Sequence, residues 1–381
     1  MEVIDMKVVV AVDSFKGSMS SREAGNAVKE GVLRVYPDAE VVVRALADGG
    51  EGTVEALMEG LGGEKVNITV TGPNNEKIES YYGYIKEKNM AVIETAAVAG
   101  LVLVEPDNRN PLTATTYGLG EMIKDAVTRG CRDFILGLGG SATNDGGVGM
   151  LQALGWEFRD SKGCEVSRGA EGLGAIASIS DDKILQILKS CRFRVACDVE
   201  NPLCGLTGAT YVYGAQKGIP DELMNKIDRD MEHYAQITSR HIGEDFSKFR
   251  GAGAAGGLGF AVLSFLHAEL IPGIELILDI IKFKEDLKDA DVLITGEGCL
   301  DSQTAMGKAP IGVARFAHKY QELKVLAFAG VVSDGARECN DKGIDAFFPI
   351  IRNITTKKEA MNTQNARRNL SDTVEQVFRI L

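Results

Sequence analysis

Two carboxylates and one lysine lie close together in the stretch TGEGCLDSQTAMGKAP, residues 295–310. Glu297 and Asp301 follow the apolar run VLIT, and Lys308 comes near the end of the stretch. Carboxylate oxygens bind Mg²⁺ and a lysine ammonium neutralises phosphate, so these residue types suit metal-assisted phosphoryl transfer. We interpret the stretch as a strand that ends in a loop holding a metal ion or an anion.

A second polar turn is FILGLGGSATNDGGVGM, residues 134–150, which contains Ser141, Thr143, Asn144 and Asp145 between a predicted strand and a predicted helix. Backbone N–H groups and short hydroxyls in such a turn form a cradle for an anion. A strained turn that needs positive φ would explain the glycines. It would not explain the cluster of polar side chains, so the pattern favours a binding function.

A third segment, ACDVENPLCGLTGATYVYGAQKG at residues 196–218, places Asp198 at the end of an apolar strand, with Asn201 and Lys217 beyond it. A carboxylate at a strand end often only caps a loop or a helix. Next to a metal ion or a phosphate it becomes a candidate base or ligand.

Two further motifs suggest functions that their context does not support. GAGAAGG, residues 251–257, satisfies G-x-G-x-x-G, but a dinucleotide fold needs a strand before it, and the polar HIGEDFSKFR stands there. These glycines can still bind phosphate at a helix start, or they can serve close helix packing. The pair at 307–308 is not a P-loop, because Ser302 and Ala309 occupy positions where that motif requires Gly and Ser or Thr.

The elements that must position these residues alternate between strand and helix at both ends of the chain. Strands are predicted at 7–15, 41–45, 292–295, 325–329 and 346–350, with helices at 22–36, 53–59, 310–320, 335–341 and from 371 to the end. This order predicts an α/β fold with a doubly wound parallel sheet, whose ligands bind beyond the carboxyl ends of the strands. The motifs DSFKG, ADGGEG, TGEG and AGVVSD all follow strands, so we expect the four of them on one rim.

The middle of the chain has a different pattern. Residues 66–95 predict a meander of short antiparallel strands, followed by helices at 117–129 and 221–240 and strands before the two polar turns. We infer a second α/β domain inserted into the first. The expected domains are residues 1–63 plus 285–381, and residues 64–284.

The composition of the chain disfavours several classes of binding partner and of enzyme. The net charge of −12 disfavours a nucleic-acid or membrane partner, because such binders carry basic patches. The seven cysteines contain no C-x-x-C pair, which indicates a reducing cytoplasm, and no apolar run approaches the length that spans a bilayer. The four histidines fall in or beside helical segments and there is no G-x-S-x-G, so a serine hydrolase lacks support.

The motifs DSFKGSMSS, ADGGEGT, GLGGSATNDGG, CDVENPLCGLTGA, GAGAAGGLG and TGEGCLDSQTAMGKAPIGVA, taken together and in this order, resemble the bacterial glycerate kinases of type 1. Ala215, in GAQKG, stands where we expect proline in that family. The resemblance implies ATP-dependent phosphorylation of D-glycerate in glycerate, glyoxylate or sugar-acid breakdown. It also implies a flavodoxin-like domain, an inserted domain like that of restriction endonucleases, and an active site between the two.

On this basis we expect Mg²⁺ at Glu297 and Asp301, with ATP as co-substrate. Lys16 and Lys308 are expected to neutralise glycerate carboxylate or the transferring phosphate. Asp198 is the first choice for the base that deprotonates the glycerate hydroxyl, and Asp48 is the second. The residues expected to bind substrate or nucleotide are Ser14, Gly139, Gly140, Ser141, Thr143, Asn144, Asn201, Lys217, Gly253, Gly256, Gly257, Gln303 and Thr304.

Several alternatives stay open. The favoured product is 2-phosphoglycerate, and the alternative product is 3-phosphoglycerate. A homo-oligomer is one expectation for the assembly. A binding module that regulates a partner, and a dehydrogenase that uses GAGAAGG, are the competing classes of function. Release of ADP from ATP in the presence of D-glycerate separates a kinase from a sensor.

Overall fold

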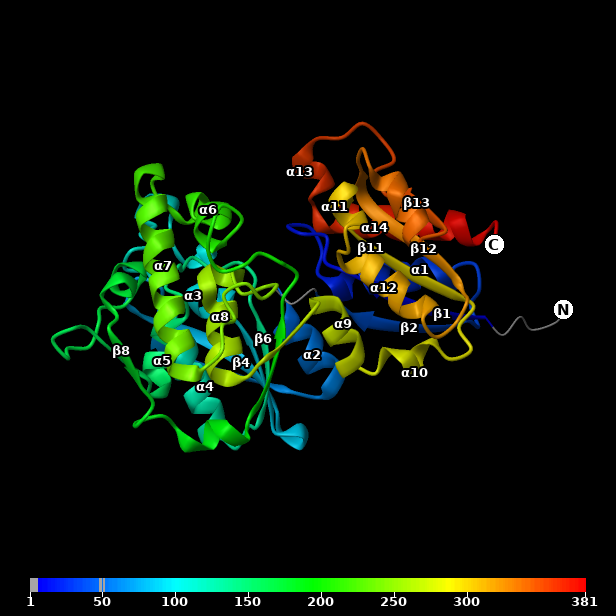
Figure 1. Ribbon diagram of the computed structural model, residues 1–381. Helices are drawn as coiled ribbons and strands as arrows, with labels where there is room; N and C mark the ends of the chain where they lie inside the picture. The colour runs from blue at the N-terminus through cyan, green and yellow to red at the C-terminus, as the bar shows by residue number, and fades with distance from the viewer. Residues whose placement is uncertain (1–5, 48–49, 51) are drawn as a thin grey trace. The chain divides into compact units, whose positions relative to one another are not determined.

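The computed structural model describes residues 6–47, 50 and 52–381, and it divides into two compact units. Unit 1 spans Met1–Asp48 and Ile274–Leu381, whereas unit 2 spans Gly49–Gly273. Figure 1 therefore colours unit 1 blue at its N-terminal part and yellow to red at its C-terminal part. Both units are mixed α/β structures that contain parallel strands, as the sequence predicts.

Unit 1 is built around a five-stranded parallel sheet with the strand order β13-β12-β11-β1-β2. Numbered within the unit, this order is 2-1-3-4-5, read from β2 to β13, which is the order of a doubly wound sheet. Its elements are β1 (Lys7–Val12), α1 (Ser21–Leu33), β2 (Glu40–Ala45), α10 (Phe283–Leu287), β11 (Val292–Leu300), α11 (Ser302–Ala305), α12 (Ala309–His318), β12 (Lys324–Val332), β13 (Ala346–Pro349), α13 (Lys357–Ala360) and α14 (Thr363–Phe378), and most of α9 (Gly273–Ile280).

Helices cover both faces of this sheet, and the alternation along β1 shows why. Val8 and Val10 pack with α1 and α14 on one face, while Val9 and Ala11 pack with α9, α10 and α12 on the other. Successive side chains of a strand point to opposite faces, so a strand covered on both sides reads as a continuous apolar run. The run KVVVAV has this form.

Unit 2 contains a six-stranded mixed sheet with the order β10-β9-β6-β5-β4-β3. β3, β4 and β5 form the predicted antiparallel meander, and β5, β6, β9 and β10 are parallel. Its elements are α2 (Thr53–Leu61), β3 (Glu64–Thr71), β4 (Lys77–Ile85), β5 (Met90–Glu94), α3 (Ala96–Ala99), α4 (Tyr117–Thr128), β6 (Asp133–Gly137), α5 (Val148–Leu154), β7 (Glu157–Arg159), β8 (Ser178–Ser180), β9 (Arg192–Ala196), α6 (Ala209–Tyr213), α7 (Asp221–Ile242), α8 (Ala254–Leu266) and β10 (Glu269–Ile271).

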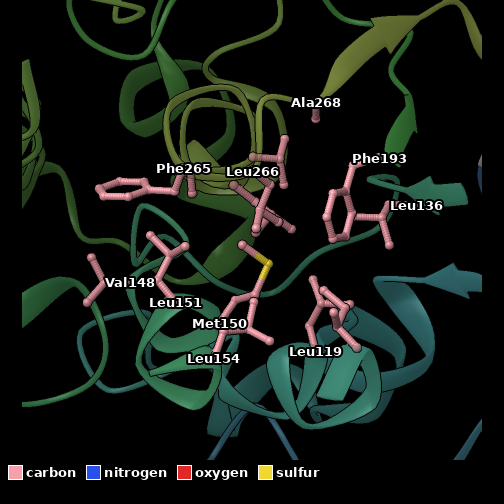
Figure 2. Packing of buried hydrophobic residues seen from close by; sticks show 14 of the residues in the cluster. Leu119, Leu136, Val148, Met150, Leu151, Leu154, Phe193, Phe265, Leu266 and Ala268 are labelled. Carbon is pink, nitrogen blue, oxygen red and sulfur yellow. The ribbon is translucent and has the colours of Figure 1, made fainter. Parts of the chain in front are cut away.

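The core of unit 2 lies between this sheet and helices α4, α5 and α8. Figure 2 shows Leu119 of α4, Leu136 of β6, Met150 of α5, Phe193 of β9 and Phe265 of α8 gathered in one cluster. All of these side chains are buried, and each fully buried apolar side chain stabilises the fold by roughly 1.5–3 kcal/mol. The polar turns after β6 and β9 begin directly at the edge of this core.

The boundaries between the units differ from the expected positions near 64 and 284. Helix α2 packs on β4 and β5, which places the segment that follows Asp48 in unit 2. Ile274 packs against Gly312 of α12, so α9 belongs with unit 1 from its second residue onward. Strand patterns locate the elements, but side-chain packing decides to which core each one belongs.

Strand β11 is longer than predicted. We expected it to end at Thr295, with TGEG as a loop, but it continues to Leu300 and pairs with β12 as far as Val332. Gly296 lacks a side chain, and a Cβ there would collide with the carbonyl oxygen of Phe328 in the neighbouring strand. Glu297 is therefore a strand residue, which holds its carboxylate more rigidly than a loop would.

Across the described residues, no helix is both long and apolar enough to cross a membrane.

Candidate functional site

In unit 1, the candidate residues gather where β1 and β11 reach the carboxyl edge of the sheet. The backbone N–H of Asp13 donates to the carbonyl oxygen of Gly296 at 2.8 Å, which joins the two chain segments. The carboxylate of Asp13 accepts the N–H of Ser14 at 2.6 Å, and Lys16 follows with an exposed side chain. The predicted convergence of DSFKG and TGEG on one rim therefore occurs.

Thr304 connects the two expected metal ligands. Its hydroxyl donates to Oε1 of Glu297 at 2.6 Å, and its backbone N–H donates to Oδ1 of Asp301 at 2.9 Å. Asp301 is the N-cap of α11 and forms a capping box with Thr304. Thr304 is thus a buried structural link between the carboxylates, whereas Gln303 is exposed.

The electrostatics of the two carboxylates differ. Burial, together with the charges on Asp13 and Asp301, raises the pKa of Glu297. Burial also acts to raise the pKa of Asp301, but the N–H of Thr304 and the charge on Lys308 outweigh it and leave that pKa lowered. The ammonium of Lys308 lies 3.6 Å from Oδ1 of Asp301. Asp301 is thus already compensated. The charge of Glu297 is buried, and Thr304 and Lys308 offset that burial only in part, so a bound cation would stabilise it.

These residues fit a Mg²⁺ ion that is shared with phosphate oxygens. Within the described part of the chain, no group of three His, Cys, Asp or Glu residues lies close enough to hold a metal by itself. Mg²⁺ commonly uses one or two carboxylates and completes its coordination with substrate phosphates and water. The raised pKa of Glu297 marks it as the carboxylate that gains most from such an ion.

In unit 2, the polar turn after β6 runs alongside α3 and the segment that follows it. Leu101 donates its N–H to the carbonyl oxygen of Gly140, and Ala142 donates to that of Ala99, both at 2.8 Å. Gly139 and Gly140 are exposed, whereas Ser141 is buried. The turn therefore presents backbone at its tip and buries the polar side chains behind it.

The residues that follow the tip are held by buried hydrogen bonds. The amide of Asn144 donates to Oγ1 of Thr210 at 3.0 Å, while Oδ1 of Asn144 and Oγ1 of Thr143 are buried and have no hydrogen-bond partner in the structure. Buried polar atoms without partners are uncommon and often mark bound water or a ligand.

Lys217 lies beneath this turn. Its ammonium donates to Oγ of Ser141 at 3.0 Å and to the carbonyl oxygen of Thr143 at 2.6 Å, and the residue is only 2% exposed. Burial lowers the pKa of Lys217 to about 7, although the charge on Asp145 acts in the opposite direction. Lys217 was selected as a binding residue, and the contacts of its ammonium in the structure are with the protein itself, at Ser141 and Thr143 of the polar turn.

Asp198 and Asn201 follow β9, which is the parallel neighbour of β6, so they leave the same edge of the sheet as the polar turn. Asp198 is an exposed residue, and its Oδ1 accepts the N–H of Gly273 at 2.8 Å. Asn201 accepts from the hydroxyl of Tyr213 at 2.7 Å, and its carbonyl oxygen accepts the N–H of Gly253 at 2.9 Å. Unit 2 thus brings Asp198 and Asn201 to the same sheet edge as the polar turn, and Asn201 also contacts the GAGAAGG segment through Gly253.

The GAGAAGG glycines pack closely against the polar turn. Gly256 and Gly257 have φ values of +68° and +89°, and a Cβ on Gly256 would collide with the carbonyl oxygen of Thr143. The carbonyl oxygen of Gly256 accepts the N–H of Gly146 at 3.0 Å. The segment before these glycines is not a strand, so the context of a dinucleotide fold is missing.

Sequence reasoning named Asp145 only as a member of the polar turn and did not select Asp13 or Thr116, although the structure places all three in these clusters. Asp13 lies in DSFKG and Asp145 lies in GLGGSATNDGG, each between a predicted strand and a predicted helix. That position could have identified them as candidate site residues. Thr116 has no such signal, because its contact with Asp145 joins distant parts of the sequence. Asp48, the second choice for the base, lies outside the described residues.

Comparison with known proteins gives a consistent result. The family model described as "Glycerate kinase family" matches residues 8–381. This chain belongs to the glycerate kinase family. The match includes both units and all six motifs.

Named members of the family are similar over nearly their whole length. The glycerate kinase of Haemophilus influenzae is 43% identical over 376 residues, which is 99% of each chain. The glycerate 2-kinase of Escherichia coli is 41% identical over 374 residues, covering 97% of this chain and 98% of the other. A crystal structure of a provisionally named glycerate kinase 2 from Salmonella typhimurium LT2 has a TM-score of 0.89 and 42% identity, and it covers 99% of this chain and 98% of that one.

Proposed function

We propose that the protein is a glycerate kinase that transfers the γ-phosphoryl group of ATP to D-glycerate, with Mg²⁺. The observation that carries the proposal is the family match over residues 8–381, which includes every polar cluster described above. Kinases depend on positioning and on neutralising charge rather than on covalent chemistry. Carboxylates, lysines and glycine turns at strand ends suit that task, and no catalytic histidine is needed.

In unit 1, we assign Glu297 as a direct Mg²⁺ ligand and Asp301 as a ligand that acts through water. Asp301 already accepts the N–H of Thr304 and faces Lys308, so fewer of its lone pairs remain for a metal. Bound Mg²⁺ would offset the negative charge of the phosphates. Lys308 and the exposed Lys16 supply further positive charge toward glycerate carboxylate or phosphate, with Ser14, Gln303 and Thr304 beside them.

In unit 2, we assign the turn of Gly139, Gly140, Ser141, Thr143 and Asn144 to substrate or nucleotide phosphate. Asn201, Gly253, Gly256 and Gly257 support it from neighbouring segments.

Asp198 is the proposed base. Its carboxylate takes the proton from the glycerate hydroxyl as the hydroxyl oxygen forms a bond to the γ-phosphorus. The bond between that phosphorus and the bridging oxygen of ADP breaks, and Asp198 later returns the proton to solvent. Asp48 is the alternative base.

We favour the 2-hydroxyl as acceptor, because a relative of 41% identity carries the name glycerate 2-kinase. The direct experiment incubates the protein with ATP, Mg²⁺ and D-glycerate, measures ADP, and identifies the product by phosphorus NMR. A 2-phosphoglycerate signal supports the full proposal, and a 3-phosphoglycerate signal corrects the position of transfer. If addition of D-glycerate causes no release of ADP, glycerate kinase activity is refuted and the sensor alternative is favoured.

A cytoplasmic setting in glycerate or sugar-acid breakdown belongs to the same proposal. All seven cysteines are free thiols, which supports a reducing compartment.

A further inference from the structure

Asp145 is a fully buried carboxylate that joins the polar turn and the start of α5 to the start of α4. Its oxygens accept the N–H and the hydroxyl of Thr116 at 2.8 and 2.9 Å, and the N–H groups of Gly147 and Gly149 at 3.1 and 3.3 Å. These four donors lie at the start of α4 and around the start of α5. A carboxylate with four donors is held in one orientation, so Asp145 fixes where the polar turn ends.

Lys217, which lies far along the chain from the same turn, holds the middle of that turn. Its ammonium spans Ser141 and Thr143, and the carbonyl oxygen of the preceding Gln216 accepts from Nη1 of Arg109 at 2.9 Å. The short helical turn Ala215–Lys217 is therefore tied to the protein on both sides. The lysine reaches the polar turn from a braced position.

We propose that Asp145 and Lys217 are positioning residues that hold residues 138–147 in the shape required to bind the anionic substrate. The proposal rests on the assignment of this turn to substrate or nucleotide phosphate. It revises the sequence-based prediction that Lys217 binds a ligand, because the ammonium is buried and contacts Ser141 and Thr143 of the turn. The exposed tip at Gly139 and Gly140 is left to face the ligand.

The positive charge of Lys217 and the negative charge of Asp145 lie in the same buried region, and the charge on Asp145 favours the charged form of Lys217. Burial lowers the pKa of Lys217, and the charge on Asp145 counters that effect. Burial raises the pKa of Asp145, and the donors on Thr116, Gly147 and Gly149 counter that effect. Removing one partner therefore leaves a buried charge without compensation, whereas removing both does not.

The experiment compares Asp145→Asn, Thr116→Val, Lys217→Met and the double variant Asp145→Asn with Lys217→Met. Each is assayed for kcat and KM with ATP and D-glycerate, for the pH profile of kcat/KM, and for amide hydrogen exchange of residues 138–147. Thr128→Val, at the far end of α4, and Lys189→Met, an exposed lysine, are the matched controls.

We expect Asp145→Asn and Lys217→Met each to lower kcat/KM by about 10²-fold, because small misplacements of a binding group are this costly. Amide exchange in residues 138–147 becomes faster in both variants. The double variant recovers thermal stability relative to the single variants but not activity. In Asp145→Asn the pKa of Lys217 falls, so the alkaline limb of the pH profile moves to lower pH, and Thr116→Val changes the profile in the same direction. The controls keep wild-type values.

Two results would overturn the proposal. If Asp145→Asn and Thr116→Val keep wild-type kinetics and exchange while Lys217→Met alone loses activity, Lys217 binds the ligand directly. If the double variant regains activity together with stability, the pair has only a structural role. A wild-type protein that releases no ADP with D-glycerate would instead refute the proposed function, and the exchange measurement would still test the positioning of the turn.

Discussion

Asp198 and Glu297 are the two side chains whose proposed roles are most directly testable. Both are acids at the carboxyl edges of parallel strands, and the carboxylate of each accepts a hydrogen bond from the protein. An amide in place of either acid keeps an oxygen that can accept that bond. The charge can therefore be removed with little effect on the fold.

For Asp198→Asn, we expect kcat to fall by roughly 10²- to 10⁴-fold, because the amide cannot take the proton of the glycerate hydroxyl. The side-chain carbonyl oxygen continues to accept the N–H of Gly273, so the melting temperature stays within a few degrees of wild type. Steady-state kinetics and thermal denaturation measure the two effects. The matched control is the exposed Asp182→Asn, and turnover of a folded Asp198→Asn close to that of wild type would exclude Asp198 as the base.

For Glu297→Gln, we expect the Mg²⁺ concentration at half-maximal rate to rise by about tenfold or more, because a direct ligand loses its charge. Asp301→Asn should shift it less, since Asp301 is engaged in the cap of α11 and with Lys308. Mg²⁺ titrations of activity compare the two variants. An unchanged titration in Glu297→Gln would place the metal elsewhere, and a larger shift in Asp301→Asn would reverse the order of the ligands.

At the scale of elements, two glycine-containing segments have structural roles that their motifs conceal. TGEG resembles a loop but is strand, because Gly296 allows β11 to continue beside β12. GAGAAGG resembles a nucleotide motif, yet Gly256 and Gly257 take left-handed backbone and pack on the polar turn. In both segments the glycine is required by the close approach of another backbone.

The cost of this close approach can be separated from the cost of left-handed backbone. Gly243, at the end of α7, has φ +82° with open space around it, whereas Gly256 has φ +68° and contacts Thr143. We expect Gly243→Ala to lower the free energy of unfolding by about 1–2 kcal/mol. Gly256→Ala should cost roughly 1–3 kcal/mol more, because the methyl group also collides with backbone.

Chemical denaturation of both variants measures this difference. Equal losses in the two variants would mean that the backbone around Gly256 relaxes freely, and that the packing of the two glycine segments is less rigid than the structure indicates.

At the scale of the molecule, each unit has a core made from its own residues. Among the described residues, the large cluster of unit 2 draws on residues 66–270, and the large clusters of unit 1 draw on residues 6–46 and 274–378. Unit 2 is also a continuous segment of chain. A domain of this size buries enough apolar surface to fold independently.

We therefore expect residues 49–273, expressed alone, to fold. The expected observations are a cooperative thermal transition and a near-ultraviolet circular dichroism signal from Trp156 and the packed aromatic rings around it. The same segment should lack kinase activity, because Glu297, Asp301 and Lys308 belong to unit 1. A segment that shows neither a transition nor fixed aromatic signals would mean that unit 2 depends on unit 1 for its stability.

The sequence by itself determined the alternation of strands and helices, the meander at β3 to β5, the polar turns at strand ends and the family. These features depend on local patterns, such as β-branched runs, glycine turns and motifs read in order. The tertiary structure decided the extent of β11, the core that α2 and α9 join, and the side chains whose hydrogen bonds are already taken. Lys217, Asp301 and Gly256 all looked like ligand-binding residues in sequence. In the structure Lys217 is buried, Asp301 caps α11 and Gly256 packs against Thr143. These contacts depend on partners distant along the chain or on the geometry of a helix cap, and local sequence patterns do not encode them.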